Sequence, residues 1–309
     1  MKLPSFPPGY VYIGLFFGLT LLVLGGVGLL IFLSTHPRTI PAAVVLFPAA
    51  LTLEPASLEA RAAIVYDPSN NRILFTKNSN QQLPLASLTK LMVAEVVLEK
   101  KSPAMLVSIT PDDLRPEGDW GLRAGDMVSL GDLLKFGLVA SSNDAMAAAA
   151  RALGSNYLAD MNLAAVNLGF TQTYFLNPTG LDINQTISGG YGSAYDVARL
   201  TALFYKRHPG FFEDTSAASV SIHASGRLLT SHATALPLFA IPGFAGAKTG
   251  YTDLAGGNLA VVFDAEVGRP LVAVVLGSTE EGRFSDIKKL ITAARLPAQA
   301  GADATSTTP

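Results

Sequence analysis

Ser87-Leu-Thr-Lys-Leu-Met-Val-Ala-Glu-Val-Val-Leu98 is apolar on nearly every side, which predicts a buried helix. Residues three apart on a helix share a face, so Lys90 is expected beside Ser87. A serine hydroxyl next to an amine can act as a nucleophile with its own base. Two further strings follow, Ser141-Ser-Asn143 and Lys248-Thr-Gly250, and they add a hydroxyl, an amide and a second amine. In this order, the three strings predict one site for acyl transfer.

Two of the three strings occur a second time in the chain. Ser285-Asp-Ile-Lys288 repeats Ser-x-x-Lys, and Ser69-Asn-Asn71 repeats Ser-x-Asn. Ser285 lies in a charged stretch, where capping a helix N-terminus is the expected role. The apolar surroundings therefore favour Ser87 over Ser285 as the reactive serine.

Composition excludes several classes of function. The net charge is −2 in 309 residues, with 22 basic and 24 acidic side chains, so we expect no nucleic-acid partner. There is no cysteine, which excludes disulfides, a thiol nucleophile and cysteine-ligated zinc. The four histidines are scattered without metal-ligand spacing. We therefore expect neither a metal nor a cofactor.

The N-terminus carries a long apolar run. Residues 3–37 contain no Lys, Arg, Asp or Glu, and about residues 10–33 are continuously apolar or small. At about 1.5 Å per residue that run can cross a bilayer. A cleaved signal peptide is the alternative, but its apolar core is usually about 7–15 residues long. We expect a membrane anchor at 1–36 with its transmembrane helix at about 10–33. A linker at 37–58, a catalytic domain at 59–296 and a disordered tail at 297–309 would follow.

Hydrophobic periodicity predicts the order of elements in the domain. A hairpin is expected at 62–66 and 73–76, and residues 91–205 are expected to be mostly helical around an irregular loop at 177–193. Strands are expected to return after about residue 217, and a closing helix is expected at about 284–294. This order predicts a chain of mixed helices and strands (α/β, more narrowly α+β). Helices would flank an antiparallel sheet and also form a separate lobe. The active site would lie where lobe and sheet meet. The expected helices are 130–139, 144–153, 157–168 and 194–205, and the expected C-terminal strands are 247–250, 257–263 and 270–276.

From Ala62 to about Ile291 the chain resembles the serine-type D-alanyl-D-alanine carboxypeptidases, which are low-molecular-mass penicillin-binding proteins. The resemblance implies the β-lactamase/transpeptidase-like fold and removal of the terminal D-Ala from peptidoglycan stem pentapeptides. It further implies a role in peptidoglycan biosynthesis, cell wall organisation and cell shape. β-Lactam antibiotics would be covalent inhibitors. The expected location is the bacterial cell membrane, as a single-pass protein with an extracytoplasmic catalytic domain. Besides the three strings, the matching stretches are Leu83-Pro-Leu-Ala-Ser-Leu-Thr-Lys, Arg123-Ala-Gly-Asp-Met-Val-Ser-Leu-Gly-Asp-Leu-Leu, Asn177-Pro-Thr-Gly-Leu-Asp182 and Lys248-Thr-Gly-Tyr-Thr-Asp253.

The resemblance also implies a role for each site residue. Ser87 would be the nucleophile, Lys90 the general base, Ser141 a proton relay, and Asn143 a positioning group for substrate and Lys90. The backbone N–H groups of Ser87 and Tyr251 would form the oxyanion hole. For Lys248 an exposed charge on an edge strand is the alternative, and for Arg283 a solvated surface arginine. The substrate-binding residues would be Lys248, Thr249, Gly250, Tyr251 and Arg283.

Two other functions stay open. A DD-endopeptidase would cut existing peptidoglycan cross-links with the same groups, and a catalytically silent protein would only bind peptidoglycan. Class A β-lactamases use a loop glutamate for deacylation, but no Glu occurs between Glu117 and Glu213 in this chain. The sequence therefore predicts that penicilloyl adducts are released slowly.

Overall fold

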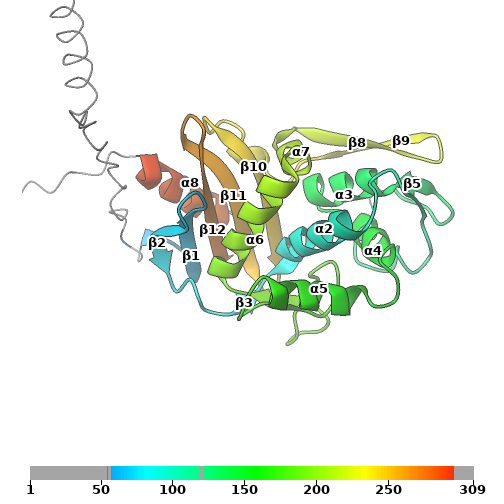
Figure 1. Ribbon diagram of the computed structural model, residues 1–309, viewed down its shortest axis with the longest axis horizontal. Coiled ribbons are helices and arrows are strands. Elements are labelled where there is room, and N and C mark those ends of the chain that lie inside the picture. Colours follow the sequence, from blue (N-terminus) through cyan, green and yellow to red (C-terminus); the bar gives the residue numbers. More distant parts are fainter. Residues whose placement is uncertain (1–53, 55–56, 119–120, 296–309) are drawn as a thin grey trace, which may run out of the picture. The chain divides into compact units, whose positions relative to one another are not determined.

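Five antiparallel strands form the central sheet, in the order β10-β11-β12-β1-β2 (Figure 1). The first strand of the domain pairs with the last, and Ala62 lies opposite Leu276. The predicted N-terminal hairpin and C-terminal strands are thus confirmed and join in one sheet. β10 is an edge strand, so one of its sides is not paired within the sheet. The bounds are β1 Ala62–Asp67, β2 Arg72–Lys77, β10 Phe244–Thr252, β11 Gly256–Glu266 and β12 Arg269–Ser278.

The computed structural model describes residue 54 and residues 57–118 and 121–295. These residues all fall within one of the two units of the chain, Pro48–Pro309. The predicted transmembrane segment at 10–33 and the predicted tail lie outside them. Within the described ranges, no helix combines the length and the apolar character that a membrane crossing requires.

Helices cover both faces of the sheet. α8 (Gly282–Arg295) packs on β11 and β12, and α6 (Ala194–Arg207) packs on β1, β11 and β12. Side chains alternate between the faces of a strand. In β1, Ile64 therefore joins one core cluster and Val65 the other. Because both faces are covered, all six residues of β1 are buried, which explains its continuous apolar sequence.

A helical lobe lies beside the sheet, around α2 (Figure 1). Nine consecutive residues of α2, Thr89 to Val97, are buried, so the predicted buried helix is confirmed. α2 packs against α3, α4, α5 and α6, which surround it and explain why it is apolar on nearly every side. The bounds are α2 Thr89–Lys100, α3 Leu130–Val139, α4 Asn143–Arg151 and α5 Tyr157–Asn167.

The region 91–205 is less helical than predicted. β4 (Leu106–Ser108) pairs with β5 (Met127–Ser129), and β7 (Gly190–Gly192) pairs with β3 (Leu83–Pro84) and β6 (Tyr174–Phe175). The expectation of an irregular loop is therefore wrong at 190–192. Strands of two or three residues are too short to show a period of two in the sequence. The remaining elements are α7 Pro209–Glu213, β8 Ser219–Ala224, β9 Arg227–His232, and the 3-10 turns η2 Ala86–Leu88, η3 Asp214–Ser216 and η4 Leu236–Leu238.

The expected cap role of Ser285 is also wrong. Ser285 lies inside the first turn of α8, where its hydroxyl donates to the Gly282 carbonyl. The side chain of Thr279 accepts from the Gly282 N–H instead. The helix begins earlier than its apolar pattern indicates, so the serine falls within it.

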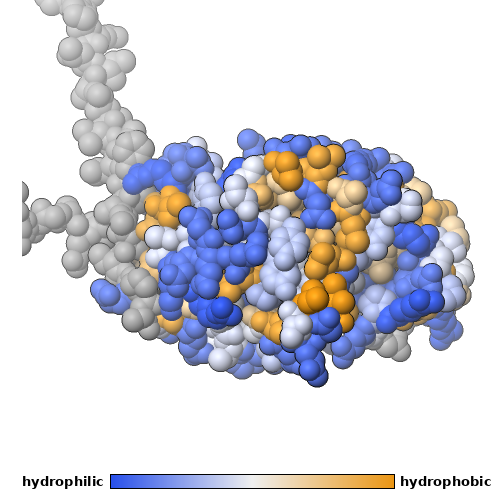
Figure 2. Space-filling model, turned by 90° about the horizontal axis from the view of Figure 1, so that it is seen from below, coloured by the Kyte–Doolittle hydropathy of each residue, from blue (hydrophilic) through white to orange (hydrophobic). Residues whose placement is uncertain are grey.

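Apolar side chains are exposed on part of the lobe. Leu163 and Val166 on α5, and Ile183 and Ile187 in the loop that follows β6, are each at least 40% exposed. Figure 2 views the molecule from below the orientation of Figure 1, on the side where α5 lies, and apolar residues form a band across this face. The surface of the lobe is therefore not uniformly polar.

Candidate active site

The predicted nucleophile, Ser87, lies in the turn η2 directly before α2. Ala86 has a φ of +48°, in the left-handed region that non-glycine residues rarely adopt. The turn is held from outside, since the Leu85 N–H donates to the Gly190 carbonyl of β7. Non-glycine residues in this conformation cluster at functional sites.

Lys90 is completely buried beside Ser87. Its Nζ lies 2.6 Å from Ser87 Oγ, 2.8 Å from Asn143 Oδ1 and 2.9 Å from the Thr179 carbonyl oxygen. Burial, and then the nearby charge of Lys248, hold the pKa of Lys90 well below the usual lysine value. A lysine of lowered pKa can be an uncharged amine that accepts the proton of the serine hydroxyl.

A second serine–lysine pair is formed by Ser141 and Lys248. Lys248 Nζ donates to Ser141 Oγ at 2.8 Å and to the Thr249 carbonyl at 2.8 Å. Burial, and then the charge of Arg283, lower the pKa of Lys248 to about 7. Only 1% of Lys248 is exposed, so the alternative of an edge-strand surface charge is wrong. Ser141 itself has a φ of +61°, while its neighbour Ser142 caps α4.

Asn143, the first residue of α4, connects Lys90 to another loop. Its Nδ2 donates to the Glu117 carbonyl at 2.7 Å, which leaves Oδ1 to face Lys90. The Glu117 and Thr179 carbonyls are the contacts that the sequence did not predict. The Asn177-Pro-Thr-Gly-Leu-Asp182 motif was recognised, but it did not indicate that a backbone oxygen of this loop reaches the lysine.

Strand β10 passes close to Ser87, the predicted nucleophile. A Cβ on Gly250 would lie 3.0 Å from the Leu85 carbonyl oxygen and 3.1 Å from the Ser87 nitrogen, so glycine permits this approach. Tyr251, the next residue, is exposed at this end of the strand. Thr249 Oγ1 donates to Thr234 Oγ1 at 2.6 Å. The Lys-Thr-Gly string therefore lies along one side of the serine.

Arg283 stands behind β10 rather than in solvent. Only 8% of it is exposed, and its Nη1 donates to the Gly250 carbonyl at 2.8 Å. The alternative of a solvated surface arginine is therefore wrong. Burial lowers the pKa of Arg283, although the nearby Glu280 carboxylate opposes this shift. The guanidinium supports the strand that borders the site and adds positive charge near Lys248.

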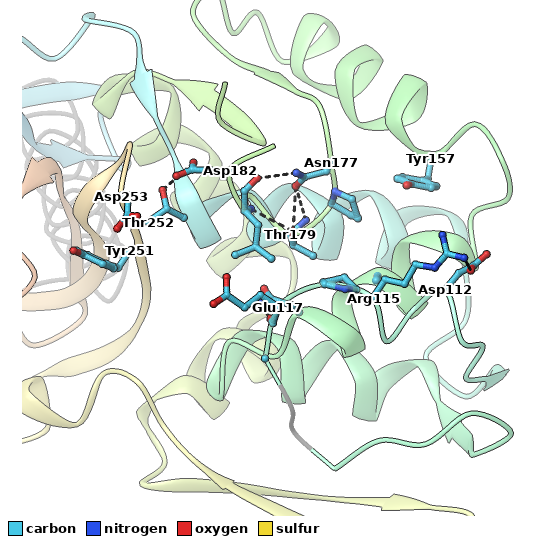
Figure 3. Close-up of a pocket in the computed structure, with 16 residues that line it drawn as sticks. Asp112, Arg115, Glu117, Tyr157, Asn177, Thr179, Asp182, Tyr251, Thr252 and Asp253 are labelled. Carbon is cyan, nitrogen blue, oxygen red and sulfur yellow. Dashed lines mark hydrogen bonds and ion pairs between the residues drawn. The ribbon is translucent and has the colours of Figure 1, made fainter. Parts of the chain in front are cut away.

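An open cavity of about 860 Å³ adjoins these residues. Asn143, Thr179 and Tyr251 are among the residues that line it, so it borders the serine–lysine site through residues that neighbour Ser87 and Lys90. Figure 3 shows Glu117, Asp182 and Asp253 around the same space, with Arg115 and Asp112 further along it. The cavity provides room for an extended chain that leads away from Ser87.

The side-chain groups of the site suit acyl transfer. In the described ranges, no three His, Cys, Asp or Glu side chains form a group that could hold a metal ion. The arrangement offers a hydroxyl nucleophile, a buried amine of lowered pKa, and a second hydroxyl that contacts a second lysine. These groups come from η2, α2, the connection between α3 and α4, and β10, where the lobe meets the sheet.

Comparisons with known proteins agree with this geometry. A family model for D-alanyl-D-alanine carboxypeptidases matches residues 49–280. The chain is 29% identical over 254 residues to the D-alanyl-D-alanine carboxypeptidase DacF of Bacillus subtilis, an alignment that covers 75% of this chain and 61% of that protein. It is 32% identical over 248 residues to a D-alanyl-D-alanine endopeptidase of Haemophilus influenzae, covering 77% of this chain and 82% of that protein.

A solved structure shares the fold. Penicillin-binding protein D2 of Listeria monocytogenes, in its ampicillin-bound form, is 29% identical with a TM-score of 0.67, over 77% of this chain and 98% of that one. The fold is therefore the α+β, β-lactamase/transpeptidase-like fold. The chain spans 61–64% of the length of the first carboxypeptidase relatives.

Proposed function

We propose that this chain, which belongs to the D-alanyl-D-alanine carboxypeptidase family, removes the terminal D-Ala from peptidoglycan stem pentapeptides. The observation that carries the proposal is the 2.6 Å separation of Lys90 Nζ and Ser87 Oγ, inside a buried site that also holds Asn143 and the Ser141–Lys248 pair. Family membership supplies the substrate class, and the geometry supplies the chemistry.

In the first step the hydroxyl of Ser87 attacks the carbonyl carbon between the two terminal D-alanines. The hydroxyl proton passes to the uncharged amine of Lys90, and the carbonyl oxygen becomes an oxyanion. The backbone N–H groups of Ser87 and Tyr251 receive that oxyanion, and this role is supported by the close approach of β10 at Gly250. The hydrogen bond between the Lys90 amine and Asn143 Oδ1 holds that amine in place.

In the second step the C–N bond breaks and the leaving amine of D-Ala takes a proton through Ser141. Lys248 lies 2.8 Å from Ser141 Oγ and can supply the proton that the hydroxyl passes on, because its pKa is close to 7. Arg283, together with Lys248 while it holds its proton, makes this side of the site positive, which suits the terminal carboxylate of the substrate. Water then attacks the ester carbonyl and the bond to Ser87 Oγ breaks. Ser87 Oγ takes back the proton that Lys90 holds, and the proton lost by the water passes through Ser141 to the Lys248 amine, which releases the shortened peptide and restores the site.

β-Lactams are proposed as covalent inhibitors that acylate Ser87. Support comes from the fold shared with penicillin-binding protein D2, whose structures contain bound ampicillin and cefotaxime. The stem peptide is proposed to leave the serine along the adjoining cavity. We also propose that the chain is anchored in the bacterial membrane by about residues 10–33, with its catalytic domain outside the cytoplasm.

A DD-endopeptidase is the second candidate. The specific support is the Haemophilus influenzae endopeptidase, which is 32% identical over 82% of its own length. Muropeptides digested with the protein would separate the two activities by mass spectrometry. Loss of one D-Ala from pentapeptides indicates a carboxypeptidase, whereas splitting of cross-linked dimers indicates an endopeptidase.

Labelling with a fluorescent penicillin tests the proposed acyl-enzyme. We expect a covalent band and a matching gain in intact mass for the wild type, because the sequence predicts slow release of the adduct. Ser87→Ala removes the attacking oxygen and should give neither signal. Ser285→Ala, at the second Ser-x-x-Lys string, is the matched control and should label like the wild type. A labelled Ser87→Ala protein would contradict the assignment, and an unlabelled wild type would favour the silent peptidoglycan-binding function.

A further inference from the structure

The Thr179 carbonyl determines where the lone pair of Lys90 can point. An uncharged amine has two N–H groups and one lone pair. Asn143 Oδ1 and the Thr179 carbonyl oxygen, at 2.8 and 2.9 Å, are both acceptors without a hydrogen, so each takes one N–H. The lone pair is then left for the Ser87 hydroxyl at 2.6 Å. The lone pair of Lys90 is therefore directed at Ser87 only while Asn143 Oδ1 and the Thr179 carbonyl oxygen both accept its N–H groups.

Asn177 holds the segment that carries the Thr179 carbonyl. Its Oδ1 accepts from the Gly180 N–H at 2.7 Å, and from the Thr179 N–H and Oγ1 at 3.2 Å each. Its Nδ2 donates to the Leu181 carbonyl at 2.8 Å. Figure 3 shows these bonds converging on the Asn177 amide, at the edge of the cavity. One side chain thus fixes the three residues around the carbonyl.

The loop that contains Thr179 and Gly180 packs closely against η2, the turn that carries Ser87. Gly180 has a φ of +80°, and a Cβ there would lie 1.8 Å from the Ala86 carbonyl oxygen. On the other side, a Cβ on Gly189 would lie 2.3 Å from Asn177 Nδ2. The Asn177 amide is therefore packed closely against Gly189, and the loop that it holds is packed closely against the turn that carries Ser87.

We propose that Asn177 is a positioning residue for acylation, which holds the Thr179 carbonyl on Lys90 and so directs the amine lone pair at Ser87. The inference rests on the proposed acyl-transfer function. When the Ser87 O–H bond breaks, its proton binds the Lys90 nitrogen as the serine oxygen bonds to the substrate carbon. The resulting ammonium has three N–H groups, directed at Asn143, Thr179 and the serine oxygen.

Asn177→Ala should change acylation in two ways. The rate constant should fall by about 10- to 100-fold, because a misplacement of about 1 Å can cost about 10²-fold. The acid midpoint of the pH–rate profile should also move to lower pH. The carbonyl accepts a hydrogen bond from the charged ammonium and stabilises it, so its loss lowers the pKa of Lys90 further. Lys248 is the charged group that acts on Lys90, and this substitution leaves it in place.

The experiment follows the rate constant for covalent labelling of the full-length protein by fluorescent penicillin over a pH series. Unfolding of a destabilised variant at acid pH would raise the apparent midpoint, so a midpoint that moves to lower pH separates positioning from a loss of stability. Asn177→Ser should be intermediate, because a serine hydroxyl forms the same kind of turn more weakly. Asn184→Ala is the matched control. Asn184 Oδ1 accepts from the Thr186 N–H, Thr186 Oγ1 and the Ile187 N–H in the exposed part of the same loop.

A slower rate with a lower midpoint in Asn177→Ala, partial recovery in Asn177→Ser and wild-type behaviour in Asn184→Ala would support the inference. If Asn177→Ala and Asn177→Ser matched the wild type in both quantities, the inference would be overturned while the proposed function stood. A slower rate at an unchanged midpoint, or an equal effect of Asn184→Ala, would assign Asn177 to loop stability alone. An unlabelled wild type would overturn the inference together with the proposed function.

Discussion

Lys248 shows how burial changes one side chain. It is 1% exposed, its pKa is lowered to about 7, and its Nζ bonds Ser141 Oγ and the Thr249 carbonyl. In the unfolded chain the same amine titrates near the ordinary value of 10.5. Between about pH 7 and 10.5 the unfolded chain therefore binds a proton that the folded chain does not. Stability gained from this group rises with pH across that window and is lost as the pH falls through 7.

Lys248→Met should remove this pH dependence. The free energy of unfolding of the wild type, minus that of Lys248→Met, is expected to grow by roughly 3–5 kcal/mol across the window. Urea denaturation of both proteins over a pH series measures the difference. Lys288→Met, which removes an exposed lysine from α8, is the control. A difference that stays constant with pH would mean that Lys248 remains charged in the folded protein.

At the scale of elements, the site is assembled where a turn, a loop and an edge strand meet. η2 carries Ser87, β10 passes it at Gly250, and the loop before β7 approaches it at Gly180. Both approaches are possible because glycine has no Cβ. The contact between loop and turn is the tighter one, since a Cβ at Gly180 would overlap the Ala86 carbonyl at 1.8 Å.

Gly180→Ala should destabilise the protein far more than Gly169→Ala. The two glycines have similar positive φ values, +80° and +70°, but nothing lies within 4 Å of a Cβ on Gly169. Gly169→Ala should therefore lower the free energy of unfolding by about 1–2 kcal/mol, from backbone strain alone. Gly180→Ala adds a backbone clash, and we expect a loss of more than about 3 kcal/mol. Equal losses in urea denaturation would show that the loop can move away from the turn.

At the scale of the whole molecule, the domain is tied together from Ser57 onward. The Ser57 carbonyl accepts from Lys289 and the Leu58 carbonyl accepts from Lys77. The Ala60 N–H donates to Asp286, a completely buried carboxylate on α8. β1 then pairs with β12, so strands from near both ends of the described chain lie side by side in the sheet. The predicted site residues all lie after Ala60 in the sequence, within the part of the chain that these hydrogen bonds hold together.

Removal of residues 1–53 should therefore separate anchoring from catalysis. The full-length chain is expected to sediment with membranes, because its apolar segment at about 10–33 can span a bilayer. The shortened chain is expected to remain in the supernatant and still react with fluorescent penicillin at Ser87. Ultracentrifugation followed by labelling of both fractions measures this. Full-length protein in the supernatant would contradict the anchor, and an unlabelled shortened chain would show that the catalytic unit needs the removed residues.

The sequence by itself predicted that Ser87 and Lys90 lie together, and it predicted most of the long elements. Ser87 and Lys90 are three residues apart, so local geometry alone brings them together. α3 was predicted with its observed bounds, Leu130–Val139, because ten residues are enough to show a helical period. The two-stranded sheet β4–β5 and the three-stranded sheet β3–β7–β6 were not predicted, since strands of two or three residues are too short to show a period of two.

Only the tertiary structure decided how the amines are held and how their pKa values are set. The Thr179 and Glu117 contacts are made by backbone oxygens, which every residue has, so no sequence motif can indicate them. The burial of Lys248 and of Arg283 depends on elements far away in the chain that cover them. Desolvation and long-range hydrogen bonds arise only when those elements pack, which is why the motif predicted the candidate groups while the fold determined their surroundings and hydrogen-bond partners.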